Sequence, residues 1–92
     1  MIHVFLPSQL ESYTDGVRDL KLDFDKELTI TLQDVVAKLD TLYKGMAFRL
    51  VDEQGRIRRH IAFFVGENMA RTLDVKIDQN ARVQIVGALS GG

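Results

Sequence analysis

The sequence predicts an α+β domain in which one main helix packs on one face of a mixed sheet of four to five strands. Two patterns support this: apolar and polar residues alternate in several short segments, and one longer segment has its apolar residues at helical spacing. The chain has 92 residues, which is typical of a single domain. With 46% hydrophobic residues and one proline, it can build one core.

The first two strands are expected at 2–6 and 20–24, where apolar residues occupy every second position. The polar stretch 8–16 separates them and ends in the turn signal Thr14-Asp15-Gly16. These segments are therefore predicted to form a hairpin with a long loop.

The main helix is expected over 31–44, where the apolar residues share one helical face. Thr29 or Thr31 can supply the N-cap oxygen, and Asp34 suits the positive end of the helix dipole. Gly45 follows as the expected C-cap. The apolar face consists of Leu32, Val35, Val36, Leu39, Leu42 and Tyr43.

A short helical turn is expected at 46–50 and a charged loop at 51–55. The most strand-like segment is 57–65, which alternates between two faces. One face carries Ile61, Phe63 and Val65, and the other carries His60, Ala62 and Phe64.

The remaining segments are shorter. A turn leads into 69–71, and 73–77 reads as an irregular edge piece. A last strand contains Val83 and Ile85 and ends at Gly87. The chain is thus expected to consist of a folded domain over 1–86 and a flexible tail over 87–92 that ends in Gly-Gly.

Charge and composition exclude several function classes. Twelve Lys and Arg against thirteen Asp and Glu give a net charge of −1, so no overall field draws the chain onto nucleic acid or a membrane. Without cysteine there is no disulfide framework, zinc ribbon or thiol nucleophile. His3 and His60 lack metal-ligand spacing, and no catalytic triad or phosphate loop occurs, so neither a metal nor an intrinsic catalytic site is expected. With no targeting segment, the expected location is cytoplasmic.

The element order and the final Gly91-Gly92 resemble the ubiquitin-like β-grasp proteins, and among them the sulfur carriers of the MoaD and ThiS type. The resemblance covers the whole chain as architecture, with residue-level support in 61–67, 81–86 and 89–92. Two departures are visible. Asp78-Gln79-Asn80 stands where the family commonly has an Asp-Gly-Asp turn, and Gly87 stands where it has a proline.

The resemblance implies a carrier and not an enzyme. A ubiquitin-activating-type enzyme would use MgATP to adenylate the Gly92 carboxylate, and a persulfide or sulfide would then displace AMP to leave a thiocarboxylate. The other implied partners are a sulfur donor such as a sulfurtransferase and a downstream synthase, and no cofactor is expected on the chain itself. If the gene encodes residues beyond Gly92, a protease must first expose the tail.

The product that receives the sulfur is left open among cysteine or homocysteine, a siderophore-like compound, thiazole and molybdopterin. The long loop 49–59 resembles the carriers for the first two groups more than the compact carriers for the others.

The tail residues Leu89, Ser90 and Gly91 are expected to thread into the partner enzyme. Glycine lacks a Cβ, so a glycine backbone can pass close to a bound nucleotide in conformations that other residues avoid. Gly92 carries the reactive carboxylate.

Two surfaces are candidates for binding the partner. On the sheet face opposite the helix, strand parity brings together Phe5, Phe64 and Val86, with Ala62 and Ala88 nearby, and such an apolar patch marks an interface unless loops or a register shift cover it. The basic run Arg56, Arg58 and Arg59 could guide docking to an acidic partner, although it could equally be a charged strand end.

Two other functions fit the same fold. A protein modifier would use the activated Gly92 to form an isopeptide bond with lysine, and a non-covalent β-grasp interaction domain would not use the tail.

Overall fold

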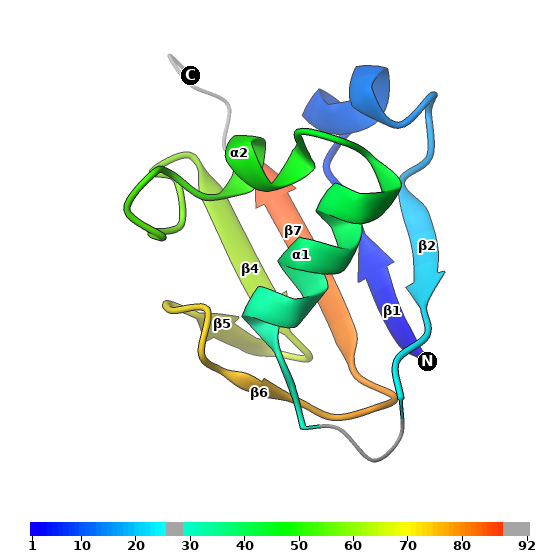
Figure 1. The fold of residues 1–92 in the computed structure, drawn as a ribbon, viewed down its shortest axis with the longest axis vertical. Coiled ribbons are helices and arrows are strands. Elements are labelled where there is room, and N and C mark those ends of the chain that lie inside the picture. The colour runs from blue at the N-terminus through cyan, green and yellow to red at the C-terminus, as the bar shows by residue number, and fades with distance from the viewer. Residues whose placement is uncertain (26–28, 88–92) are drawn as a thin grey trace.

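A computed structural model describes residues 1–25 and 29–87, and its main layer is a five-stranded sheet in the order β2-β1-β7-β4-β5 (Figure 1). β1 (Ile2–Phe5) pairs antiparallel with β2 (Asp19–Leu22) and parallel with β7 (Arg82–Gly87). β4 (Ile61–Val65) pairs antiparallel with the other side of β7 and with the edge strand β5 (Asn68–Ala70). The predicted α+β class, the mixed sheet and the hairpin are confirmed.

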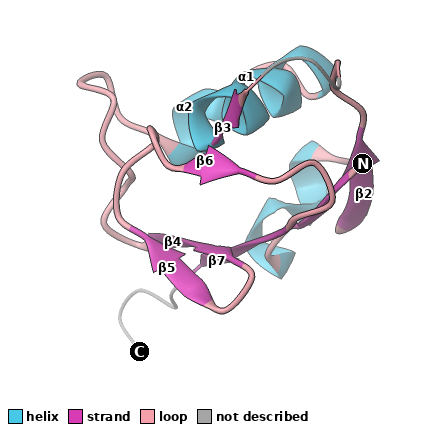
Figure 2. Cartoon of the chain, turned by 90° about the horizontal axis from the view of Figure 1, so that it is seen from below, coloured by secondary structure: helices cyan, strands magenta, loops and turns pink. Residues whose placement is uncertain are grey.

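The second layer is helical, and Figure 2 shows that both α-helices lie on the same side of the sheet. α1 spans Leu32–Leu42 and begins with a capping box, in which the Thr31 hydroxyl accepts the Asp34 amide N–H and the Asp34 carboxylate accepts the Thr31 N–H. Thr31, and not Thr29, is therefore the N-cap.

The C-terminal end of α1 differs from the prediction. Tyr43 is the C-cap, and Gly45, with φ of +94°, instead precedes α2 (Met46–Leu50). The Asp40 carboxylate accepts the N–H groups of Gly45 and Ala47 and so supplies the cap of α2. The left-handed glycine is required by the turn between two helices, not by the end of one.

The predicted strand 57–65 is shorter than expected. Only Ile61–Val65 joins the sheet, because Ile57 bridges to Val51 and closes the preceding loop on itself. The structure also adds a 3₁₀ helix, η1 (Ser8–Tyr13), in the loop expected to be only polar.

The segment expected to be an irregular edge piece has a defined role. It contains β6 (Lys76–Ile77), which pairs with β3 (Ile30–Thr31) in a separate two-stranded sheet. The carbonyls of Val75 and Leu73 accept hydrogen bonds from the N–H groups of Leu32 and Gln33. These N–H groups lie in the first turn of α1, where the helix offers them no carbonyl partner. The segment therefore completes the start of α1.

The core lies between the two layers. Phe63, Val4 and Val83 face α1 and are fully buried, as are Leu32 and Leu39 from the helix side. The opposite side of the sheet, called the outer face below, carries the alternate residues of the same strands. Within the described residues, no helix is long and apolar enough to span a membrane.

The 52–56 loop contains a carboxylate whose ionisation is part of its fold. Asp52 Oδ1 accepts the N–H groups of Arg56 and Gln54, each at 2.9 Å. The bond from Arg56 is the main reason that the pKa of Asp52 lies below its ordinary value of 3.8, and the Gln54 bond and the charges of Arg56 and Arg58 add to it against the opposing effect of desolvation.

This lowered pKa predicts a pH dependence of the loop. A carboxyl whose pKa falls on folding stabilises the folded loop above pH 3.8, and that stabilisation is lost as the pH drops through the lower folded-state value. The amide NMR shifts of Gln54 and Arg56 should titrate together with a midpoint below 3.8. Asp52→Asn should remove this titration, and a midpoint above 3.8 would contradict the assignment.

Candidate functional site

The site predicted from sequence begins where β7 ends. Gly87 is the last described residue and pairs with Ile61, the first residue of β4. Ala88, Leu89, Ser90, Gly91 and Gly92, on which the predicted chemistry depends, lie outside the described residues.

Gly87 is held by a side chain from the other end of the chain. The Gln9 amide Nε2 donates a hydrogen bond of 2.9 Å to the Gly87 carbonyl oxygen. A Cβ added at Gly87 would lie 3.1 Å from the Gln9 amide group, so the space beside this glycine is occupied by the side chain that binds it. Gln9 therefore fixes the point from which the tail departs, at the position where the resembled family has proline.

This contact predicts a sign change in a double-mutant cycle. Gly87→Ala should destabilise the protein because it pushes the Gln9 amide away and weakens a bond worth about 0.5–1.5 kcal/mol. In a Gln9→Ala background the same change should stabilise by about 0.4–1 kcal/mol, since alanine then only restricts the unfolded chain. Urea denaturation of the four proteins measures both effects. Additive effects would show that the two residues are not coupled.

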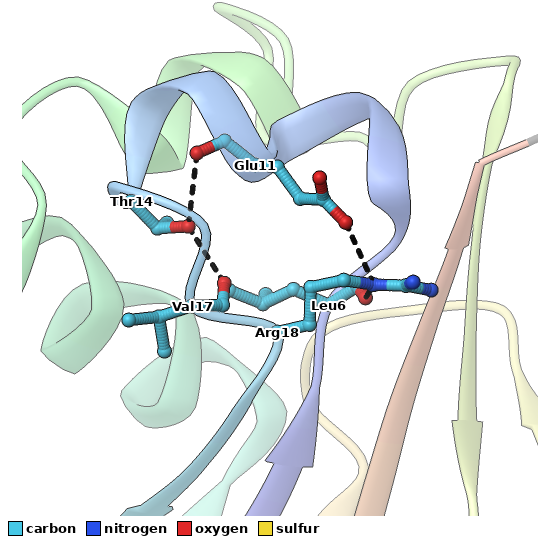
Figure 3. A network of polar contacts seen from close by, with 5 residues as sticks. All are labelled: Leu6, Glu11, Thr14, Val17 and Arg18. Atoms are coloured by element: carbon cyan, nitrogen blue, oxygen red, sulfur yellow. Dashed lines mark hydrogen bonds and ion pairs between the residues drawn. The ribbon is translucent and has the colours of Figure 1, made fainter.

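The 3₁₀ helix that carries Gln9 is fastened to the β1–β2 hairpin by the polar network in Figure 3. Thr14 is only 2% exposed. Its hydroxyl donates a hydrogen bond of 2.6 Å to the Val17 carbonyl and also contacts the Glu11 carbonyl. Arg18 Nε donates to the Leu6 carbonyl at 3.3 Å and lies 3.5 Å from the Glu11 carboxylate. Gln9 is thus positioned by a loop whose own hydrogen bonds hold it against the hairpin.

The outer face beside Gly87 carries the predicted partner-binding patch. Ala62 pairs with Val86, and Phe64 pairs with Gln84, which pairs with Phe5 on its other side. All four predicted residues therefore lie on the same face, as parity requires, but Gln84 lies between Phe5 and Phe64. The apolar surface is less continuous than the sequence predicts.

The two parts of this face differ in character. Phe5 is flanked by polar side chains, because the Arg82 guanidinium lies 4.4 Å from its ring centroid and the centroid of the His3 ring lies 4.3 Å away. On the other side, Met69 pairs with Phe64 and is 48% exposed, which the sequence reading missed. We use "apolar patch" for Ala62, Phe64, Met69 and Val86. Met69 is assigned to this patch by its pairing with Phe64 between β4 and β5, which the sequence alone does not determine.

Two hollows meet at Gly87. One, of about 510 Å³, reaches the outer face between Phe5 and Val86. The other, of about 360 Å³, is lined by η1, α2 and the start of β4. Pro7, Gln9 and Gly87 line both hollows, so the chain leaves β7 on the ridge between them.

The predicted docking charges are divided by the structure. Arg58 lines the 360 Å³ hollow, where its Nε donates to the Phe48 carbonyl at 2.6 Å. Arg56 and Arg59 are exposed and line neither hollow. Arg49, which the sequence reading did not select, also lines the 360 Å³ hollow. Arg49 reaches this hollow because α2 lies beside η1, which is a tertiary arrangement that the sequence does not reveal.

Among residues 1–25 and 29–87, no group of three or more His, Cys, Asp or Glu side chains is arranged to hold a metal ion.

Comparison with known proteins gives matches by structure only, since no protein-family model and no curated protein matches the sequence. A chain of the BexX/CysO complex of Amycolatopsis orientalis aligns over 100% of both chains, with a TM-score of 0.86 and 21% identity. CysO of Mycobacterium tuberculosis, described as an antigen, has a TM-score of 0.83 and 26% identity over 97% of this chain and 100% of its own.

A third similar structure is small archaeal modifier protein 1 of Haloferax volcanii, with a TM-score of 0.81 and 20% identity over 99% of this chain and 98% of its own. These similarities confirm the predicted ubiquitin-like β-grasp fold and the resemblance to its carrier-type members. One of the similar structures belongs to a protein named as a small modifier protein.

Proposed function

We propose that this chain is a sulfur carrier whose Gly92 carboxylate is adenylated by a ubiquitin-activating-type enzyme and converted to a thiocarboxylate. One observation carries the proposal: the central strand of a β-grasp sheet ends at Gly87, on a ridge between two hollows, and the sequence then runs five residues to Gly91-Gly92. The ridge supplies a fixed base for a tail that has to enter another protein.

The chemistry needs two steps. In the first, a Gly92 carboxylate oxygen attacks the α-phosphorus of MgATP bound by the partner, which forms an acyl-adenylate and releases pyrophosphate. In the second, hydrosulfide attacks the carbonyl carbon and expels AMP, leaving the thiocarboxylate. With a persulfide from a sulfurtransferase, the product of attack is an acyl disulfide, and a second thiol then cleaves its S–S bond to release the thiocarboxylate.

This chain contributes reach and a narrow backbone to these steps. Five residues beyond Gly87 span at most about 18 Å when fully extended. Glycines at 91 and 92 lack a Cβ and allow close approach to a nucleotide. The sequence contains no cysteine, so no thiol on the carrier competes for the activated carboxyl group.

The apolar patch is the surface proposed to bind the adenylating enzyme. Met69 and Val86 are 48% and 37% exposed, and Val86 immediately precedes Gly87. An enzyme that takes up the tail must cover this end of the sheet. The solved relative in complex with BexX supports the idea that such a fold binds a protein partner. A downstream synthase would use the same end of the carrier after sulfur is loaded.

The loop 49–59 favours cysteine, homocysteine or a siderophore-like compound as the acceptor. It contains the end of α2 and the bridge between Val51 and Ile57, and its residues Arg49 and Arg58 line a hollow with Gly87, so it is a structured segment beside Gly87 and not a loose connection.

The test is a mass measurement on the intact chain. Incubation with the adenylating enzyme, MgATP and sulfide should replace one oxygen by sulfur, and peptide mapping should place the change at Gly92. The variant lacking Gly91 and Gly92 is the matched control and should show no change. If the full chain keeps its mass while the enzyme forms AMP from a known carrier, the proposal is wrong.

The second candidate is a protein modifier, which is favoured by the similarity to a protein named small archaeal modifier protein 1. It shares the adenylation step but ends in an isopeptide bond to lysine. Denaturant-resistant conjugates that depend on Gly92 would favour it over the carrier. A partner that still binds after removal of Gly91 and Gly92, with no loss of function, would instead favour a non-covalent interaction domain.

A further inference from the structure

The hollow of about 360 Å³ beside Gly87 has two guanidinium groups stacked on exposed aromatic rings. The Arg49 guanidinium lies 3.6 Å from the Tyr13 ring centroid, and the Arg58 guanidinium lies 4.6 Å from that of Phe48. Tyr13 and Phe48 are 45% and 63% exposed. Aromatic residues and arginine are the residue types enriched in protein interfaces.

Neither arginine forms an ion pair with a carboxylate within the described residues. The two ion pairs found there join His3 to Asp19 and Arg18 to Glu11. The nearest effect on a carboxylate is the charge of Arg58 on the pKa of Asp52, which lies outside the lining of the hollow. Arg58 uses its Nε to bind the Phe48 carbonyl, and its terminal amino groups have no hydrogen bond to the described part of the chain. The hollow is therefore a local positive site on a chain whose net charge is −1.

Stacking prepares a guanidinium for a carboxylate. The ring holds the planar group by its face, so that its N–H edge stays open for two parallel hydrogen bonds to a carboxylate. Fewer side-chain conformations are then lost when the partner binds. The geometry thus favours a carboxylate-bearing ligand.

The position of the hollow says which protein supplies that carboxylate. Gly87 is part of its lining, and Gly92 can lie no more than about 18 Å from Gly87. A protein whose active site holds Gly92 must therefore lie against this end of the domain. Val86, a residue of the apolar patch, lines the 510 Å³ hollow on the other side of the same ridge, so one protein can contact both the patch and the Arg49–Arg58 hollow.

We propose that the Arg49–Arg58 hollow docks an acidic segment, bearing Asp or Glu side chains, of the protein that takes up the tail. The inference rests on the proposed function for the identity of this protein. The apolar patch supplies contact area, and the hollow supplies charge recognition. Charge recognition of this kind raises association rates and rejects partners without the acidic segment.

The first experiment tests the hollow without any enzyme. The ¹⁵N-labelled chain is titrated with N-acetylated, C-amidated tetraglutamate, and with tetraglutamine as the neutral control. The Nε–H signals of Arg49 and Arg58 and the Gly87 amide should shift with tetraglutamate alone. The doubly reversed variant R49E/R58E should lose the response, while R56E/R59E, with the same change in charge outside the hollow, should keep it.

Three outcomes of the titration would overturn the inference. Shifts centred on Arg56 and Arg59 would show a general response to positive charge. An unchanged response in R49E/R58E would place the peptide elsewhere. A stronger response of the same signals to oligouridylate than to tetraglutamate would assign the hollow to nucleic acid.

The second experiment uses the adenylating enzyme and measures the KM and kcat of the chain as substrate. R49E/R58E should raise KM by at least about tenfold, which is about 1.4 kcal/mol, with kcat unchanged. The effect should shrink between about 0.05 and about 0.5 M salt. Equal KM values for R49E/R58E and R56E/R59E would contradict the inference. If the wild-type chain is not adenylated at all, the proposed function fails, and the peptide titration still decides the role of the hollow.

Discussion

Replacing Phe63 by alanine should destabilise the domain by about 3–5 kcal/mol, whereas the same change at Phe64 should cost on the order of 1 kcal/mol. The two residues are neighbours in β4, but Phe63 is fully buried against α1 and Phe64 is half-buried on the outer face. Domains are stable by only about 5–15 kcal/mol, so the loss at Phe63 removes a large share of the total.

Urea unfolding followed by circular dichroism measures both losses, and the pair is its own control because the chemistry of the change is identical. Similar losses at the two positions would mean that the outer face is covered in solution or that β4 is shifted by one residue.

Placing a carboxylate on the apolar patch should have the largest effect on partner binding. Phe64→Asp and Val86→Asp should each raise the KM of the chain as a substrate of the adenylating enzyme by about 100-fold, or about 2.7 kcal/mol. The physical reason is that an interface would bury the new charge without a partner. Both residues are already partly exposed, so the fold should tolerate the change.

Lys21→Asp is the matched control. Lys21 lies on β2 and pairs with His3 of β1. The substitution therefore introduces the same aspartate on the outer face, two strands away from β7. KM should change by less than about threefold, as expected for a surface position outside an interface. If Lys21→Asp weakens binding as much as Phe64→Asp does, the effect comes from overall charge and the patch is not the binding surface.

The parts of the fold that the sequence predicted well are those set by local pattern. The helical spacing of Leu32, Val35 and Leu39 and the N-cap of Thr31 require only neighbouring residues, and both are present in the structure. The alternation of Phe63 and Phe64 likewise assigned each side chain to its face before any strand order was known.

The errors arose where a residue outside the periodic segment decides the local structure. Ile57 alternates like a strand residue, but its bridge to Val51 removes it from the sheet. Gly45 follows a helical pattern, but a second helix begins immediately after it. In both cases the element that lies next along the chain, and not the periodic pattern itself, determines the conformation.

Most of the candidate site also depends on tertiary contacts. Gln9 and Gly87 are 78 positions apart, and no spacing rule connects them. Arg49 was overlooked because a lone arginine in a short helix carries no signal until Tyr13 is placed beside it. The predicted chemistry, by contrast, rests on Gly91-Gly92, which lies outside the described residues.

The strand order has a consequence for biosynthesis. β7 leaves the ribosome after all the other described strands, yet it occupies the middle of the sheet between β1 and β4. A nascent chain that stops before residue 82 lacks the strand that pairs with both β1 and β4, so the two halves of the sheet have no hydrogen-bonded connection. Pairings between the ends of a chain also form slowly, because a long loop must close first. A partner that recognises the end of β7 therefore selects chains whose synthesis and folding have both reached this strand.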